Sequence, residues 1–274
     1  MKNNIITIFK KECARFFGDW GLFFTAVIMP GLVIYLTYTF IGNGVQSQLG
    51  PVDPVELADD IAMGRSIWGN LLPMLMVMLL FSGIMAAVPS AITGEKERGT
   101  IATLLVTPMR RSELALGKLL SLSLFALLSG LSSFLGIMLS LPKMMGGSGL
   151  GISAFSLGDY AALLLVIFST VLILVGCVSV LSAFAKDVKT AGTMMLPFMF
   201  VVMTVGLLPM MGIGTDAWWG GLIPVYNSVR SMTDIISGTG TWLPVLLTLL
   251  SNIACASLTV WLLTLQLNSE RIML

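Results

Sequence analysis

Residues 93–120, TGEKERGTIATLLVTPMRRSELALGKLL, form a compact basic segment next to two long runs that contain no charged residue. The run before it covers residues 66–94, and the run after it covers residues 119–142. Each run is longer than the roughly 20 apolar residues that a helix needs to cross a bilayer. The segment is therefore expected to connect two spanning helices on one side of a membrane.

The same pattern recurs along the whole chain of 274 residues, of which only 11% are charged and 56% are hydrophobic. Soluble domains carry about 25% charged residues, so lipid is the natural solvent for this surface. The runs lack the strict alternation of a membrane β-barrel, and the sequence predicts a single-domain, all-α integral membrane protein with six transmembrane helices. The charge-free runs cover residues 20–52, 66–94, 119–142, 160–185, 190–215 and 235–269.

The distribution of basic residues predicts the orientation of the six spans. An even number of spans places both termini on one side, together with segments 93–118 and 186–189. Short loops rich in lysine and arginine face the cytoplasm, so we expect both termini there, in a bacterial cell membrane. Twelve of the 15 basic residues lie on that side: Lys2, Lys10, Lys11, Arg15, Lys96, Arg98, Arg110, Arg111, Lys118, Lys186, Lys189 and Arg271.

Residues 1–19 precede the first span and have an amphipathic pattern. Gly18 and Asp19 interrupt this pattern before Trp20, which favours a separate cytoplasmic helix lying along the inner leaflet. A plain helical extension of the first span is the alternative. The expected apolar face consists of Ile5, Phe9, Cys13 and Phe16, with Lys10, Lys11 and Arg15 pointing elsewhere.

Three connections are expected outside. Residues 43–65 contain two prolines and four acids and are predicted to be a loop with one short helix, and the glycine-rich residues 143–158 a flexible loop. Residues 212–242 are semi-apolar and contain aromatic side chains that favour the membrane interface. We expect two short helices there, near 216–222 and 227–237, that dip into the outer leaflet. A plain exposed loop is the alternative.

Several kinds of chemistry are missing from the chain. It contains no histidine, which removes the commonest general base and most catalytic zinc sites. The P-loop signature is absent, because Gly117-Lys118 is followed by leucine. The predicted span interiors carry no ionisable residue of the kind that marks proton relays. We therefore expect no catalytic residue, no metal site and no cofactor in this chain, and we expect no nucleic-acid partner.

The connection between the second and third spans has the pattern of a short transverse helix. Thr100 can cap it, and Ile101, Leu104 and Leu105 then fall on one face. Pro108 ends it, because the residue before a proline is pushed away from helical angles. An exposed apolar face in the cytoplasm needs a partner, although a snug basic loop remains the alternative.

The stretch GEKERGTIATLLVTPMRRSELALGKLL resembles the cytoplasmic segment of type-2 ABC exporter permeases. In that family Glu-x-Glu-Arg-Gly-Thr is followed by a Leu-Leu-Val-Thr-Pro stretch and a Gly-Lys before the next span. The six-span layout resembles the family over nearly the whole chain. The later stretch LIPVYNSVRSMTDIISG resembles the sodium-efflux and drug-export branch.

The resemblance implies a membrane subunit of an exporter, with no ATPase site of its own. ATP and magnesium would be bound by a soluble P-loop ATPase subunit, present in two copies, and a second permease chain, identical or a sibling, would complete the pathway. A motor-independent secondary transporter or channel is the alternative, followed by an intramembrane hydrolase and a scaffold without transport. A cleft rich in methionine and phenylalanine would suit drugs, lipids or amphipathic peptides.

The resemblance also implies roles for individual residues. Residues 100–108 would be the coupling helix seated on the ATPase, and residues 216–238 a re-entrant external hairpin. The coupling residues are Glu95, Glu97, Arg98, Gly99, Thr100, Ile101, Leu104, Leu105, Pro108 and Arg111; the charged ones would steer docking and the apolar ones would fill a pocket. The hairpin residues are Trp218, Trp219, Pro224, Tyr226 and Asn227.

Overall fold

Six helices within the part of the chain that the structure describes are long and apolar enough to cross a membrane, as the charge-free runs predict. The computed structural model describes residues 2–48, 54–99, 111–144, 156–214, 220 and 223–268. Within these residues the regular structure is helical throughout. The membrane-crossing stretches are Trp20–Thr37, Asn70–Glu97, Glu113–Ser140, Leu157–Phe184, Val188–Met210 and Trp242–Gln266. The prediction of an all-α, six-span architecture is confirmed.

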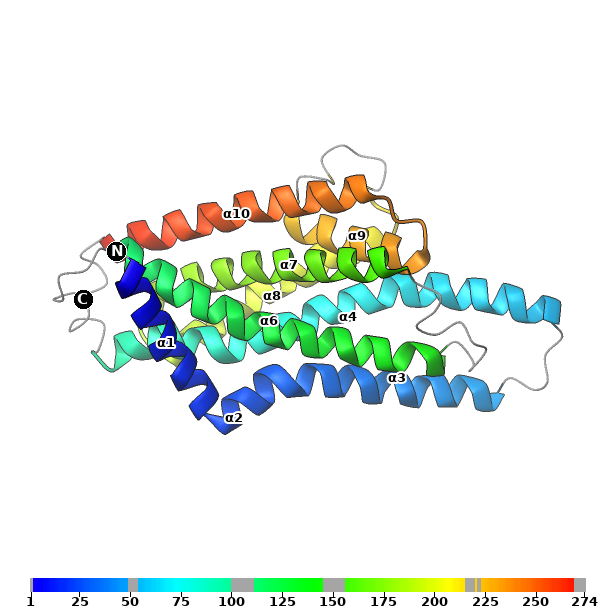
Figure 1. Ribbon diagram of the computed structural model, residues 1–274, viewed down its shortest axis with the longest axis horizontal. Helices are drawn as coiled ribbons and strands as arrows, with labels where there is room; N and C mark the ends of the chain where they lie inside the picture. The colour runs from blue at the N-terminus through cyan, green and yellow to red at the C-terminus, as the bar shows by residue number, and fades with distance from the viewer. Residues whose placement is uncertain are drawn as a thin grey trace.

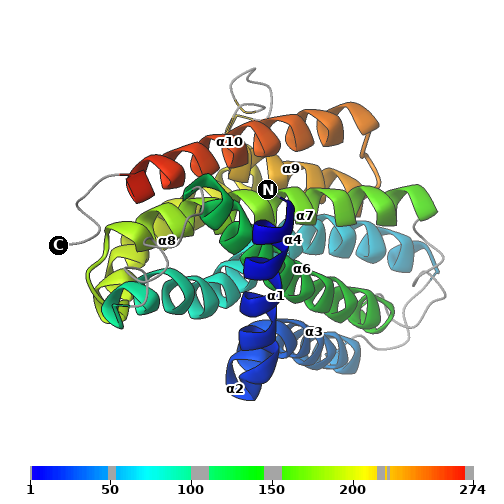
Figure 2. The ribbon, with the colours of Figure 1, turned by 60° about the vertical axis from the view of Figure 1, so that its left-hand side comes forward.

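The long helices run side by side in an elongated bundle, and α1 lies obliquely across one end of it (Figure 1). Helices α3 and α10 lie on opposite sides of the bundle in both ribbon views (Figures 1 and 2). The elements are α1 Lys2–Gly18, α2 Trp20–Phe23, the π-helix η1 Phe24–Ile28, α3 Met29–Gln48, α4 Pro54–Glu97, α6 Arg111–Met144, α7 Leu157–Phe184, α8 Val188–Met210, α9 Pro224–Ser237 and α10 Trp242–Asn268.

The break expected between the N-terminal helix and the first span is present. Helix α1 ends at Gly18, and the carboxylate of Asp19 caps the next helix by accepting a hydrogen bond from Leu22 N at 3.1 Å. The first span then continues without interruption through α2, η1 and α3. Asp19 thus satisfies one of the free N–H groups at a helix start, which lets α1 leave the direction of the span.

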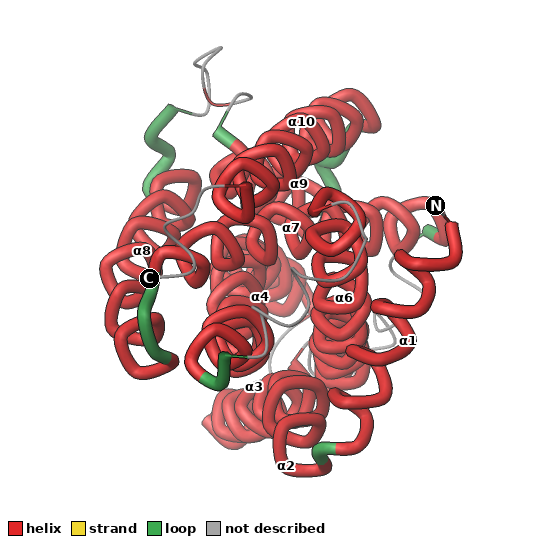
Figure 3. The backbone as a smooth tube through the Cα atoms, turned by 90° about the vertical axis from the view of Figure 1, so that its left-hand side faces the viewer, coloured by secondary structure: helices red, strands yellow, loops and turns green. Residues whose placement is uncertain are grey.

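Helix α7 lies at the centre of the bundle, surrounded by α4, α6, α9 and α10 (Figure 3). Two thirds of its spanning residues are buried, at 67%, and its mean hydropathy of 2.9 is the highest of the six spans. In contrast, only 22% of the spanning residues of α8 and of α10 are buried. Those two helices therefore present apolar faces outward, where lipid or another chain must cover them.

Helices α3 and α6 approach each other through glycines. A Cβ atom at Gly31 would overlap the backbone of Ser132, and a Cβ atom at Gly136 would overlap the backbone of Gly31. Small residues let membrane helices come close enough for extensive van der Waals contact, which replaces the hydrophobic drive that lipid removes. The first span is thereby held against α6, which also carries α1.

The connection predicted as a loop at residues 43–65 is mostly helical, which corrects that expectation. Helix α3 continues to Gln48, and α4 begins at Pro54 and is 44 residues long. The reason lies in Pro54, whose fixed backbone angle suits the first position of a helix. From the sequence alone, a proline at this position is equally consistent with a loop and with the start of a helix. Residues 145–155, from the other predicted external loop, lie outside the described residues.

The close α3–α6 contact generates a stability prediction. Replacing Gly136 with alanine should lower the free energy of unfolding by about 1–3 kcal/mol, because the facing backbone of Gly31 cannot move aside without strain. Thermal unfolding of the purified protein in detergent measures the loss. Gly192→Ala is the matched control, since nothing lies within 4 Å of a Cβ at that helical position. Equal stability of the two variants would contradict the packing argument.

Candidate functional site

The end of α4 and the beginning of α6 flank residues 100–110 and are joined by a buried ion pair. The ammonium Nζ of Lys118 on α6 donates a hydrogen bond to Glu95 Oε2 on α4. The same ammonium donates to the carbonyl oxygen of Ala91 at 2.9 Å. The side chains of Lys118 and Glu95 are only 7% and 8% exposed. The pair therefore fixes the two helices together close to where the chain leaves the bundle.

Helix α1 adds a second acid and a second base to this pair. Glu12 Oε1 lies 3.5 Å from Lys118 Nζ, and Arg15 Nη1 lies 3.7 Å from Glu95 Oε1. Arg15 Nη2 also donates to the carbonyl oxygen of Ser90 at 2.9 Å. We name the four charged residues Glu12, Arg15, Glu95 and Lys118 the neck cluster. It joins three helices at the membrane end nearest the predicted coupling segment.

The neck cluster is balanced, with two acids and two bases that shield one another from the apolar bundle. Charges taken out of water are tolerated only when paired in this way. Glu12 is 2% exposed. Burial raises the pKa of Glu12 above its ordinary value; the Lys118 ammonium opposes this rise, and the Glu95 carboxylate adds to it. Ionised Glu12 is thus held at an electrostatic disadvantage, although Lys118 lies beside it.

The same end of α4 is tied to the turn between α7 and α8. The hydroxyl of Thr93 donates to the carbonyl oxygen of Ser182 at 2.7 Å, and both residues are buried. The backbone N–H of Val188, at the start of α8, donates to Glu97 Oε2 at 3.1 Å. A displacement of the end of α4 therefore acts directly on α6, α1 and the α7–α8 turn.

The structure places part of the predicted coupling set. Glu97, Arg98 and Gly99 lie exposed at the end of α4, and Gly99 has the left-handed φ of 69° that glycine adopts most easily. Glu95 is instead buried in the neck cluster. Arg111 is the first residue of α6. Thr100, Ile101, Leu104, Leu105 and Pro108 lie outside the described residues, as does the side chain of Arg111.

The sequence did not identify Glu12, Arg15 and Lys118 as a cluster, and the expected apolar face of α1 needs correction. The most buried residues of α1 are Ile8, Glu12 and Phe16, at 8%, 2% and 1% exposure. Glu12 can lie in the middle of this buried face because Lys118 of α6 is there to pair with its carboxylate. One signal was available: Glu12 stands four residues from both Ile8 and Phe16, so it shares their helix face.

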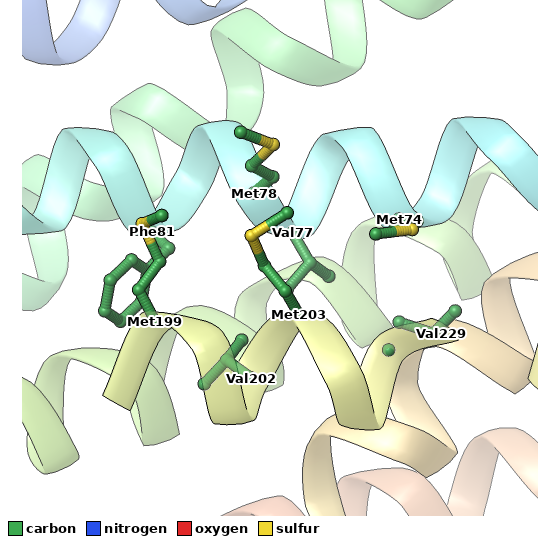
Figure 4. Close-up of a pocket in the computed structure, with 9 residues that line it drawn as sticks. Met74, Val77, Met78, Phe81, Met199, Val202, Met203 and Val229 are labelled. Carbon is green, nitrogen blue, oxygen red and sulfur yellow. The ribbon is translucent and has the colours of Figure 1, made fainter. Parts of the chain in front are cut away.

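An apolar groove lies between α4 and α8, away from the neck. Its cavity volume is about 10 Å³, so the side chains that line it lie close together. Met199 and Met203 project from α8 toward α4, where they face Phe81 and Val77 (Figure 4). Flexible, polarizable thioethers let a surface adapt to differently shaped apolar molecules. The residues that line the groove are Met74, Val77, Met78, Phe81, Met199, Val202, Met203, Gly206 and Val229.

Helix α9 lies where the second short helix of the external segment was expected. Pro224 occupies its first turn, and Gly238, with φ of 77°, ends it. Tyr226 is fully buried and its hydroxyl donates to the carbonyl oxygen of Ile213 at 2.9 Å, while Asn227 is 3% exposed. Trp218 and Trp219 lie outside the described residues, as does most of the first short helix expected at 216–222.

The chain was compared with known protein families and with known proteins. The model of a family described as "ABC-2 family transporter protein" matches residues 6–224. That range contains the neck cluster, the whole groove except Val229, and the first five spans.

One curated relative is the ABC transporter permease protein NatB of Bacillus subtilis (strain 168). It is 30% identical to this chain over 182 residues, which cover 63% of this chain and 45% of the relative. The chain thus aligns with less than half the length of that protein.

The neck cluster generates a prediction about buried charge. Replacing Lys118 with methionine should lower the free energy of unfolding by about 3–5 kcal/mol, because Glu12 and Glu95 lose their shared cation. Thermal unfolding in detergent micelles measures the effect. The exposed Lys189 provides a matched control through Lys189→Met, which should stay close to wild type. A double change of Lys118→Met with Glu95→Gln should recover part of the loss, and no recovery would argue against pairing as the cause.

The raised pKa of Glu12 generates a prediction about pH. A carboxyl group whose folded pKa lies above the ordinary value of 4.5 favours folding in its protonated form. Its ionisation therefore weakens the fold as pH rises from about 4.5 through the raised pKa. Glu12→Gln should remove this decline, so the stability difference between variant and wild type should shift in favour of the variant as pH increases. Unfolding temperatures measured from pH 4.5 to 8 test it; a shift in the opposite direction would refute it.

Proposed function

The chain belongs to the ABC-2 family of transporter proteins, as a permease subunit, and from this premise we propose that it exports cargo with ATP hydrolysed by a separate P-loop ATPase subunit. The observation that carries the proposal is the neck cluster. It joins α1, α4 and α6 near the end of α4 and the beginning of α6, the two helices that flank the proposed docking segment. The chain itself carries no P-loop signature and no histidine, so the energy source lies in a partner.

The rigid neck supports a lever mechanism. ATP would close two ATPase subunits, which would push on residues 100–108 beneath each permease chain. The buried Lys118–Glu95 pair would pass that movement to α6 and α4 together, and Arg15 would carry it to α1. The exposed Glu97 and Arg98 remain the candidates that steer docking, whereas Glu95 would position the segment from inside the bundle. ATP and magnesium would stay on the partner.

The apolar groove supports a cargo with apolar surface. Its lining contains four methionines and one phenylalanine, which adapt well to varied apolar shapes. Hydrated ions would find no oxygen ligand among its side chains, since the lining residues are all apolar or glycine. The chemistry of this lining would therefore suit a drug, a lipid or an amphipathic peptide better than a metal ion, once α4 and α8 move apart to make room for it.

The outward apolar faces support assembly with a second permease chain, either a copy or a sibling. Helices α8 and α10 leave most of their spanning residues uncovered, and α8 also forms one wall of the groove. Two chains facing each other would enclose a central path. The positive side of the chain supports a cytoplasmic neck and a cytoplasmic N-terminus in the cell membrane of a bacterium, with α9 on the outer side.

Co-purification tests the proposal most directly. The tagged chain, expressed in its own host and extracted gently, should carry a soluble P-loop protein in equal amount, and the complex in liposomes should hydrolyse ATP. Export would be followed with a lipophilic fluorescent dye trapped on the ATPase side. Dye movement by the chain alone, without ATP or a partner, would favour the motor-independent transporter instead.

The proposed docking helix generates a prediction about two residues of unequal weight. Leu104→Asp should abolish at least nine tenths of the permease-dependent ATP hydrolysis, because a buried anchor carries most of an interface's energy. Arg111→Ala should reduce it only a few-fold, since rim charges mainly set association rates. ATP hydrolysis by the reconstituted complex measures both. Equal effects of the two changes would count against an apolar docking pocket.

A further inference from the structure

A buried polar node joins three helices in the half of the bundle opposite the neck. Asn252 on α10 is fully buried, and its amide Nδ2 donates to Ser169 Oγ on α7 at 2.9 Å and to Ser228 Oγ on α9 at 3.0 Å. Ser169 and Ser228 are themselves 3% and 0% exposed. Asn252 follows Trp242 by ten residues along α10, about 15 Å along the axis. The start of α9 is therefore anchored well inside the bundle.

The donors and acceptors at this node can be assigned one by one. The hydroxyl of Ser169 donates to the carbonyl oxygen of Val166 at 2.9 Å, and that of Ser228 donates to the carbonyl oxygen of Pro224 at 2.8 Å. Each serine hydroxyl thus donates its only proton to a backbone carbonyl oxygen of its own helix. The two N–H groups of the Asn252 amide supply the missing donors, one to each serine, while its oxygen accepts no hydrogen bond from the described residues.

We propose that Asn252 is a positioning residue that ties helix α9 to α7 and α10, so that the three helices move as one body. A second bond one turn away strengthens the tie, because the hydroxyls of Ser231 and Thr248 lie 2.7 Å apart. The joint movement of the three helices during transport rests on the proposed function. The hydrogen bonds that hold α9 do not, because they lie within this chain.

The opposite face of α9 makes contacts of another kind. Val229 lies on that face and lines the groove together with residues of α4 and α8. A Cβ at Gly206 of α8 would lie 3.7 Å from Val229 Cγ2, an ordinary apolar contact. Apolar contacts have no preferred direction, whereas the hydrogen bonds at Asn252 hold donor and acceptor in register. Asn252 thereby sets where α9 stands beside the groove, and α9 slips against α4 and α8 more easily than against α7 and α10.

Hydrogen–deuterium exchange of the permease alone, in lipid nanodiscs, tests the tie. Asn252→Leu keeps the approximate volume and removes both donors, and it should speed exchange of the α9 amides at least tenfold, with α7 and α10 within twofold of wild type. Ser228→Ala is a milder change that should raise α9 exchange several-fold. The control is Ser257→Ala, an exposed α10 hydroxyl that donates to the carbonyl oxygen of Ile253 in its own helix, and it should leave α9 unchanged.

The double variant Asn252→Leu with Ser228→Ala separates a bond from a packing defect. If the two groups act through their shared hydrogen bond, the double variant should exchange no faster than Asn252→Leu. Effects that multiply would overturn the proposal. So would α9 exchange within twofold of wild type in Asn252→Leu, or an equal rise over all helices, which would indicate general loosening.

A second arm uses the complex with its co-purified ATPase. Vanadate-trapped ATP should change exchange at α9 in step with α7 and α10 in the wild type, while in Asn252→Leu the response of α9 should separate from theirs. A wild-type α9 that responds alone would overturn the joint movement. If no ATPase co-purifies, the proposed function fails, but exchange in the permease alone still decides whether Asn252 holds α9.

Discussion

The ion pair between Lys118 and Glu95 is the constraint on which the rest of the molecule depends. Two opposite charges at the membrane end of α4 and α6 cannot return to water without pulling the helices apart, so they hold the ends of the two spans together. Glu12 and Arg15 complete the pairing, which fastens α1 across the bundle end in a fixed position. The tight α3–α6 packing then builds on an α6 whose position is already set at its neck end.

Polar and apolar contacts have different roles within the bundle: the polar contacts fix helices to one another, and the apolar contacts leave them freer to move. Directional bonds occur at the neck, between α4 and the α7–α8 turn, and at the Asn252 node. Between them lies the methionine-lined groove, whose contacts depend on proximity alone. A lipid environment makes this division natural, because burial of apolar surface gives helices little reason to associate there and hydrogen bonds and close packing must do so. A transporter needs both parts: bodies that stay rigid and a seam that yields.

Much of the fold was predictable because the bilayer acts on local composition. The six spans, the break at Gly18 and the helix after Pro224 all follow from runs of like residues and from backbone preferences. The part of α4 that precedes its span was not predicted to be helical, because Pro54 signals a loop and a helix start equally well. Glu95 was expected at the docking surface, since a charged residue in a polar segment gives no sign of a buried partner elsewhere in the chain.

The sequence by itself determined that the chain has six segments able to cross a membrane, that its basic residues gather in the connections of one predicted side, and that it contains neither a P-loop signature nor a histidine. Those properties depend on the composition of consecutive residues, and the length, apolarity and charge of such a stretch decide how it inserts into a bilayer. Only the tertiary structure decided that Glu12 faces Lys118 and that Asn252 meets Ser169 and Ser228. Such pairings join residues from different helices, and their strength depends on distances and shielding that no local pattern contains.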